Sequence, residues 1–299
     1  MRKSVIYYFL FLFFLLSIFA SGVIDSQDGF QYLAVARNIY YKGEPTAPSP
    51  EDYYKGKNIH MSTEIAANGK PYSPTGLGFS LAMIPAVALT DIFYKIYHVS
   101  PPVYFPLEAD WLILMTANFT NCFFAAGLGI IFFLYFLTLG LNKKQSFLMS
   151  FISIFTTNLF AYSKHIFAHM MFITLLGGSF LAIKYYSLTK KRVYLVISGL
   201  AYGLMIITYN QSFIFTLPSY LIYYFMLNNS KIDLKKIKQS LFNGVFVLIG
   251  IIPFSYLYSW YNAIRDGAGD PPTNLTNFVT NNVSYLASYL KIGVLFEGL

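Results

Sequence analysis

Long apolar stretches recur along this 299-residue chain and constrain its fold more than any other feature. A helix needs roughly 20 mostly apolar residues to cross the hydrocarbon core of a bilayer. Stretches of about this length occupy residues 4–24, 74–97, 112–141, 146–164, 166–188, 193–209, 212–227 and 239–262. Only 11% of the residues are charged, whereas a soluble domain has about 25%. The pattern predicts an all-α, polytopic transmembrane helix bundle.

The basic residues indicate which loops face the cytoplasm. Lys and Arg are enriched in the cytoplasmic loops of membrane proteins. Here they form four clusters, at Arg2 and Lys3, Lys143 and Lys144, Lys190 to Arg192, and Lys231 with Lys235, Lys236 and Lys238. Asp233 is the one acidic residue among these loops, out of 13 in the chain. We therefore expect a cytoplasmic N-terminus and an external first loop over residues 25–111.

The stretch 74–97 must then be a helix that does not cross. The chain passes from outside at residue 25 to inside at Lys143, which requires an odd number of crossings. Pro85 removes a backbone donor from this stretch, and Asp91 and Lys95 add charge. We expect an interfacial or re-entrant helix here and about seven crossings in total. The alternative is a true crossing, which would place Lys143 outside.

The first external loop opens with two carboxylates, Asp25 and Asp28, close to the outer membrane face. A second short interfacial helix is expected to begin near Asp28. Its side chains at helical spacing are Phe30, Leu33, Ala34 and Arg37. The simplest role of Asp28 is an N-cap, because Asp is a favoured capping residue, but this role does not exclude a functional one.

These segments resemble the GT-C superfamily of integral-membrane glycosyltransferases. The resemblance lies in Asp28, in the Ala-x-x-Ile helix at 36–39, and in Tyr-Ser-Pro-Thr-Gly-Leu-Gly-Phe-Ser-Leu-Ala-x-Ile-Pro at 72–85. It continues through Tyr-Ser-Lys-x-x-Phe-x-His at 162–169 and Gly-Leu-x-x-Gly-Leu at 199–204. The nearest branch is that of bacterial relatives of protein O-mannosyltransferases and lipid A aminoarabinose transferases. It implies that residues 1–299 are a single module of this type.

The resemblance implies a reaction on the external face. A sugar would move from a polyprenyl-phosphate donor to a hydroxyl of a lipid, glycan or protein acceptor, with inversion at the anomeric carbon. Asp28 would be the general base, with Asp25 as the second candidate. The developing phosphate charge requires cations, and the candidates for the donor site are Arg37, Lys70 and Arg265. The implied location is the bacterial cytoplasmic membrane, with the active face outside.

Further candidates for donor binding lie at the outer ends of later spans. Lys164, His165 and His169 come between two spans, and the spacing of the two histidines could place them on one helix face like zinc ligands. Buried neutral histidines are the simpler interpretation, so a divalent metal is left open. Asn210 and Gln211 are expected in a short external turn, where they could contact sugar hydroxyls or serve as ordinary loop residues.

Other function classes receive less support. The chain has no phosphate loop for ATP, and the crossing stretches carry no charge deep in their middle, which weakens an ion-coupled transporter. The basic clusters fit membrane lipids and not nucleic acid. A transporter of lipids or lipid-linked sugars and a non-catalytic or truncated membrane subunit stay as alternatives. The apolar stretch 285–299 is expected either to continue in a longer protein or to dock at the interface.

Overall fold

The chain forms a helical bundle in a computed structural model, which describes residues 2–22, 26–47, 64–66, 68–98, 111–228 and 234–265. The helices of the first half are α1 (Arg2–Ile18), α2 (Gln27–Lys42), α4 (Leu77–Ile96), α5 (Trp111–Thr138), α6 (Lys143–Phe155) and α7 (Asn158–Lys164). Those of the second half are α8 (Ala168–Thr189), α9 (Val193–Thr208), α10 (Asn210–Asn228) and α11 (Leu234–Arg265). Two short strands, β1 (Glu64–Ile65) and β2 (Pro71–Tyr72), pair antiparallel with Glu64 opposite Tyr72.

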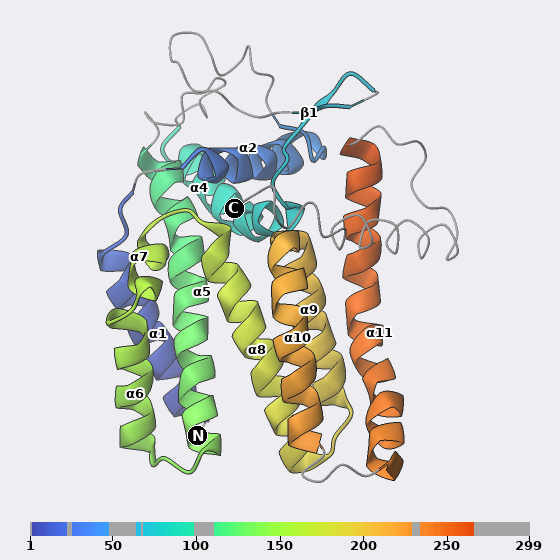
Figure 1. Cartoon of the computed structure of the whole chain (residues 1–299). Coiled ribbons are helices and arrows are strands. Elements are labelled where there is room, and N and C mark those ends of the chain that lie inside the picture. Colours follow the sequence, from blue (N-terminus) through green and yellow to red (C-terminus); the bar gives the residue numbers. More distant parts are fainter. Residues whose placement is uncertain are drawn as a thin grey trace, which may run out of the picture.

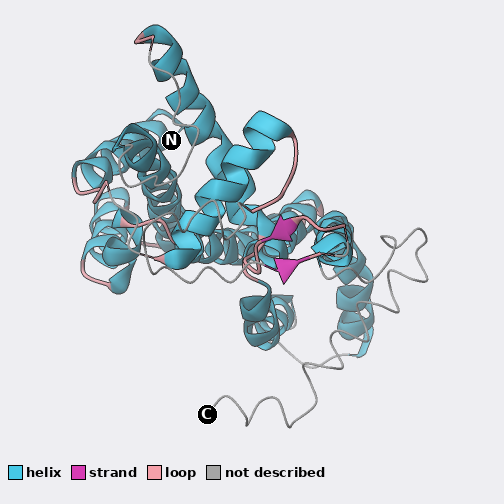
Figure 2. Cartoon of the chain, turned by 90° about the horizontal axis from the view of Figure 1, so that it is seen from above, coloured by secondary structure: helices cyan, strands magenta, loops and turns pink. Residues whose placement is uncertain are grey.

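The long helices run side by side, and two helices lie across one end of the bundle. In Figure 1, α5, α8, α9, α10 and α11 follow the long axis, whereas α2 and α4 lie across the upper end. The strands lie at the same end, and Figure 2 looks down on it. We call this end the α2–α4 end. The predicted all-helical bundle is thus present in the part of the chain that the structure describes.

Each predicted apolar stretch contains helix, but only some of these helices are long enough to span a membrane. Four described helices, α4, α5, α8 and α11, are long and apolar enough to cross a membrane, and the bent pair of α6 and α7 would make a fifth. The apolar parts of α1, α9 and α10 are shorter, at 10–17 residues each. Several long apolar helices are therefore compatible with a membrane protein, while the count of seven crossings stays a prediction.

The stretch 146–164 is not the single helix that its composition suggests. Thr156 ends α6, and the Thr157 hydroxyl accepts a hydrogen bond from the amide of Leu159, which starts α7. The two helices meet at 68°. A threonine pair that ends one helix and caps the next explains the break, because Thr favours caps over helix interiors.

The four basic segments all lie at the end of the bundle opposite α2 and α4. The start of α1, the α5–α6 turn, the α8–α9 turn and the start of α11 lie at the lower end in Figure 1. This arrangement groups the segments that the charge pattern assigned to one side of a membrane. The grouping follows from the fold, because consecutive long helices alternate in direction.

Charged residues of α4 hold it against α2. Asp91 accepts hydrogen bonds from the hydroxyls of Tyr40 and Tyr41, both at 3.1 Å, and pairs with Lys95 at 2.8 Å. Below this cluster, Tyr32 and Leu33 of α2 pack with Phe79, Met83 and Val87 of α4 in a buried core. Pro85 does not interrupt α4, which is one helix from Leu77 to Ile96. A proline that loses one backbone hydrogen bond is tolerated there by packing on both sides.

Candidate functional site

The first turn of α2 exposes Asp28. Ser26 is the N-cap, and its hydroxyl accepts a hydrogen bond from the amide of Gly29 at 3.0 Å. The predicted N-cap role of Asp28 is therefore wrong, because a serine two residues earlier already fills it. The Asp28 side chain is exposed at the α2–α4 end. Asp25, the second predicted carboxylate, lies outside the described residues.

Tyr32 connects Asp28 to the segment Ser73–Gly76 that precedes α4. It lies one turn after Asp28 and is buried, and its side chain is hydrogen-bonded to that of Thr75. Burial raises the pKa of the Tyr32 hydroxyl, and the negative charge of Asp28 raises it further. The hydroxyl therefore stays protonated at neutral pH and can donate. Sequence reasoning did not single out Tyr32 or Tyr209.

Buried hydrogen bonds fix the segment Ser73–Gly76. The Ser73 hydroxyl donates to the side-chain oxygen of Gln31 at 2.9 Å and lies 2.6 Å from the Thr75 hydroxyl. Tyr261, near the end of α11, donates from its hydroxyl to the Ser73 carbonyl at 3.2 Å. The segment thus joins α2 to α11, which lie far apart in the sequence. A fixed segment of this kind can hold a ligand in one orientation.

Gly76 and Gly78 allow the start of α4 to touch the end of α9. A Cβ atom built on Gly76 would lie 2.5 Å from the Thr208 carbonyl oxygen, and one on Gly78 would collide with the Thr208 hydroxyl. Only glycine therefore permits this backbone approach. The Pro/Gly-rich block that the sequence singled out is a docking segment between helices.

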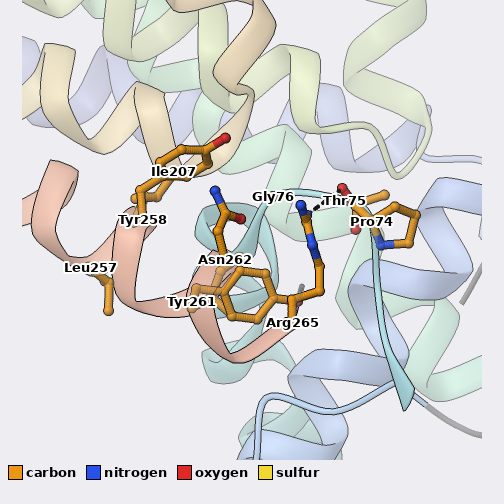
Figure 3. A pocket seen from close by; sticks show the side chains of 10 residues that line it. Pro74, Thr75, Gly76, Ile207, Leu257, Tyr258, Tyr261, Asn262 and Arg265 are labelled. Carbon is orange, nitrogen blue, oxygen red and sulfur yellow. Dashed lines mark hydrogen bonds between the residues drawn. The ribbon is translucent and has the colours of Figure 1, made fainter. Parts of the chain in front are cut away.

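A pocket lies between the start of α4 and the end of α11, beside Thr75. It is a small recess of about 20 Å³, enough for about one water molecule, and it opens to the outside. Figure 3 shows the residues that line it, which are Pro74, Thr75, Gly76, Leu77, Ile207, Leu257, Tyr258, Tyr261, Asn262 and Arg265. One arginine and no carboxylate lie in this lining. Arg265 donates from Nη1 to the Pro74 carbonyl at 3.4 Å, so the predicted donor-site cation lines the pocket.

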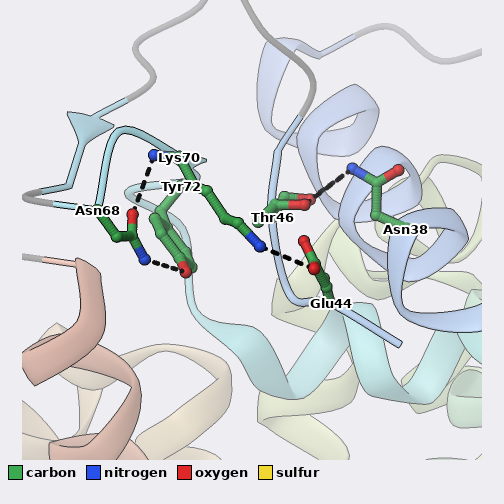
Figure 4. A network of polar contacts seen from close by, with 6 residues as sticks. All are labelled: Asn38, Glu44, Thr46, Asn68, Lys70 and Tyr72. Atoms are coloured by element: carbon green, nitrogen blue, oxygen red, sulfur yellow. Dashed lines mark hydrogen bonds and ion pairs between the residues drawn. The ribbon is translucent and has the colours of Figure 1, made fainter. Parts of the chain in front are cut away.

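Two other predicted donor-site cations lie away from this pocket lining. Lys70 pairs with Glu44 at 2.7 Å in the polar network of Figure 4, where both side chains are about half exposed. Arg37 lies within α2 as predicted, and its guanidinium is 6.0 Å from the centre of the Tyr41 ring. Arg37 lies nine residues after Asp28, which corresponds to about 13.5 Å of helix rise. Neither cation lines the pocket.

The α7–α8 junction carries the fourth predicted cation, Lys164, and the two histidines. The Lys164 ammonium lies 4.1 Å from the centre of the Phe160 ring, and Lys164 ends α7. His165 is the extended residue after α7, and His169 lies in the first turn of α8. The two histidines therefore do not share one helix face, and that expectation is wrong. No group of three metal-binding side chains occurs among the described residues.

Asn121 of α5 holds this junction in place. Its side-chain amide donates to the carbonyls of Tyr162, His165 and Phe167. His169 stacks on Tyr162 with ring centres 5.4 Å apart, and Tyr209 lies 5.1 Å away. Tyr209 follows the end of α9 directly, so the junction borders the segment where α9 meets the start of α4. Sequence reasoning missed Asn121, although a polar side chain inside an apolar helix is a signal of a functional or structural role.

Asn210 and Gln211 do not form a turn. Both belong to the first turn of α10, and Tyr209 alone separates α10 from α9. Their side chains lie outside what the structure describes, so the predicted sugar contacts stay a prediction. The physical reason for the difference is that a single non-helical residue, Tyr209, is enough to reverse the chain between the two helices.

Tyr32, Thr75 and the pocket with Arg265 are thus brought together, and Asp28 lies one helical turn from Tyr32, while Lys70 and Arg37 lie outside the pocket lining. In the comparisons with known proteins, no family model, no curated protein and no solved structure matches the chain.

Proposed function

We propose that the chain is a membrane glycosyltransferase that moves a sugar from a polyprenyl-phosphate donor to a hydroxyl of a lipid, glycan or protein acceptor. One observation carries the proposal. Asp28 is exposed at the α2–α4 end, and Tyr32 and Thr75 connect it to a pocket that contains Arg265. A carboxylate linked through Tyr32 and Thr75 to a pocket that contains a cation suits a displacement that takes a proton from one oxygen and leaves charge on another.

In the proposed reaction, Asp28 accepts the proton of the acceptor hydroxyl. The hydroxyl oxygen forms a bond to the anomeric carbon as the bond from that carbon to the phosphate oxygen breaks. Polyprenyl phosphate leaves with the bonding electrons, and the configuration at the anomeric carbon is inverted. Arg265 offsets the charge that develops on the phosphate. The exposure of Asp28 supports its access to an acceptor.

The proposed location is the bacterial cytoplasmic membrane, with the N-terminus in the cytoplasm and Asp28 on the external face. The basic segments lie at the end of the bundle opposite α2 and α4, which supports this orientation. In the proposal, α4 stays at the external interface although it is long enough to span. Its position across the bundle end and its ties to α2 through Asp91 support an interfacial role.

Sugar transfer by the purified chain in lipid vesicles tests the proposal. The donors are polyprenyl phosphates that carry a radiolabelled hexose or pentose, offered with a mixed lipid and glycan acceptor fraction. We expect label to become covalently bound to acceptors in proportion to the amount of protein. Label that crosses the vesicle membrane while it stays on the donor would instead establish a transporter of lipid-linked sugars.

A further inference from the structure

The turn between α8 and α9 places Arg192 on an aromatic face of α11. The Arg192 guanidinium lies 5.4 Å from the centre of the Phe242 ring and 4.9 Å from that of Phe246. Both distances are within the range of a cation–π contact. The two phenylalanines are four residues apart, so they lie on one face of α11. Since Arg192 is itself exposed, the rings hold its side chain while the charge stays accessible.

Buried contacts fix this turn against α11. Asn243 donates from its side-chain amide to the Tyr186 hydroxyl at 2.8 Å, and both residues are buried. Further along the two helices, Gly199 and Gly250 bring the backbones of α9 and α11 together. The position of Arg192 relative to α11 is therefore set by the fold before a ligand binds, which reduces the entropy cost of binding.

The positive charge at this place has little to balance it. Lys238 is exposed on the same face of α11, one turn before the first of the two rings. The segments that carry Arg192 and Lys238, residues 184–200 and 234–250, contain no acidic residue. Asp233 precedes α11 and lies outside the described residues. These two cations therefore suit an anionic ligand.

The surface next to the two cations is apolar. Val193, Ile197 and Leu200 recur at helical spacing on α9, and all three are exposed. Ile249 is exposed on α11. A Cβ atom on Gly250 would collide with the backbone of Leu200, so the exposed strips of the two helices border the line where the helices touch. An apolar surface that begins at a cationic turn suits a ligand with an acyl chain behind an anionic headgroup.

We propose that the α8–α9 turn and α11 form a binding site for an acidic glycerophospholipid of the leaflet that meets this end of the bundle. Arg192 and Lys238 bind the phosphodiester of the headgroup, and an acyl chain follows the exposed strip of α9. A zwitterionic lipid binds more weakly, because its headgroup carries a cation beside the phosphate. The site lies at the end of the bundle opposite α2 and α4, so it does not depend on the proposed sugar transfer.

Lipid binding by the full chain in a non-ionic detergent tests the inference. The probes are phosphatidylglycerol, phosphatidylcholine with the same acyl chains, and glycerol 3-phosphate. The rise in melting temperature with probe concentration measures each affinity. We expect phosphatidylglycerol to bind at least about fivefold more tightly than phosphatidylcholine, and glycerol 3-phosphate to give no protection. Arg192→Gln should weaken phosphatidylglycerol binding about fivefold and leave phosphatidylcholine binding unchanged.

Lys144→Gln is the matched control, because it removes an exposed positive charge from the α5–α6 turn, at the same end of the bundle but on the flank away from α11. It should keep the wild-type affinity for phosphatidylglycerol. If Arg192→Gln does not fold, Lys238→Gln removes the second cation and leaves the contact of Arg192 with the two rings in place.

Three results would overturn the inference. They are equal affinity of the wild type for the two lipids, an unchanged preference in whichever of Arg192→Gln and Lys238→Gln folds, and an equal loss in Lys144→Gln, which would indicate a general effect of surface charge. Protection by glycerol 3-phosphate as strong as that by phosphatidylglycerol would identify a soluble phosphate as the ligand and would also overturn the assignment of a lipid.

Discussion

At the scale of single residues, a glycine decides whether the start of α4 can pack at the α2–α4 end. Gly76 lies against the backbone of Thr208, and a methyl group there would meet a carbonyl oxygen that belongs to a helix end. Because the obstacle is backbone, the local structure must shift to accept any side chain. Thr75 and the rim of the pocket would shift with it, since they are adjacent in the chain.

Gly76→Ala is therefore expected to destabilise the protein by about 1–3 kcal/mol and to reduce binding of ligands to the pocket. Thermal unfolding in detergent measures the first effect. Gly127→Ala serves as the control, because a Cβ there would meet only the Thr174 methyl group at 3.6 Å, an ordinary contact. Equal melting temperatures for both variants and the wild type would contradict the close approach of α4 and α9.

The site residues show what the sequence could predict and what it could not. The first-loop position of Asp28 and the unusual block at 72–85 were visible in the sequence, and both lie at the same end of the bundle. The N-cap was misassigned, because Ser26 and Asp28 are both good caps and only the backbone distinguishes them. Tyr32, Tyr209 and Asn121 act through contacts between distant segments, which a single sequence does not reveal.

At the scale of whole helices, glycines allow α9 and α11 to come into contact. Gly199 and Gly203 are four residues apart on α9, and a Cβ on either would collide with α11. Gly250 of α11 faces them, and a Cβ there would collide with the backbone of Val196 and Leu200. Small residues at this spacing let membrane helices approach closely. The contact positions the end of α11, which carries Asn262 and Arg265.

We expect Gly250→Ala to weaken the α9–α11 contact and to lower the melting temperature, despite the higher helix propensity of alanine. Gly244→Ala in the same helix makes the same chemical change where nothing lies within 4 Å. That variant should melt at or slightly above the wild-type temperature. A melting temperature of Gly250→Ala at or above that of Gly244→Ala would show that the two helices are not in backbone contact.

The helices themselves were largely predictable, because a long apolar stretch in the sequence is a strong signal for a helix. Every predicted stretch contains helix in the structure. The break between α6 and α7 was missed, since the two threonines at 156 and 157 are weak signals inside an apolar run. The predicted turn at Asn210 was wrong for a related reason, because one non-helical residue, Tyr209, takes the place of the expected loop. Local capping geometry, and not composition, sets these boundaries.

The central question for the whole molecule is whether α4 crosses the membrane. If α4 is interfacial, the end of α2 and the end of α4 lie on one side, and the α5–α6 turn lies on the other. If α4 crosses, the end of α2 and the end of α4 lie on opposite sides of the membrane. The chain suits labelling with cysteine reagents, because its one cysteine, Cys122, is buried in the structure.

We expect Lys42→Cys and Tyr97→Cys to react with a membrane-impermeant maleimide from the same side, and Lys144→Cys from the opposite side. All three side chains are exposed in the structure. Wild-type protein, with Cys122 alone, provides the background. Labelling of Lys42→Cys and Tyr97→Cys from opposite sides would establish α4 as a crossing and reverse the assignment of the basic loops.

The rate of sugar transfer by Asp28→Asn tests the central claim most directly. We expect the variant to keep the melting temperature of the wild type and to lose at least about 100-fold in transfer, because asparagine cannot accept the proton of the acceptor hydroxyl. Glu44→Gln makes the same change on another carboxylate of the first loop and should transfer at the wild-type rate. Transfer by Asp28→Asn at the wild-type rate would contradict the assignment of Asp28 as the base.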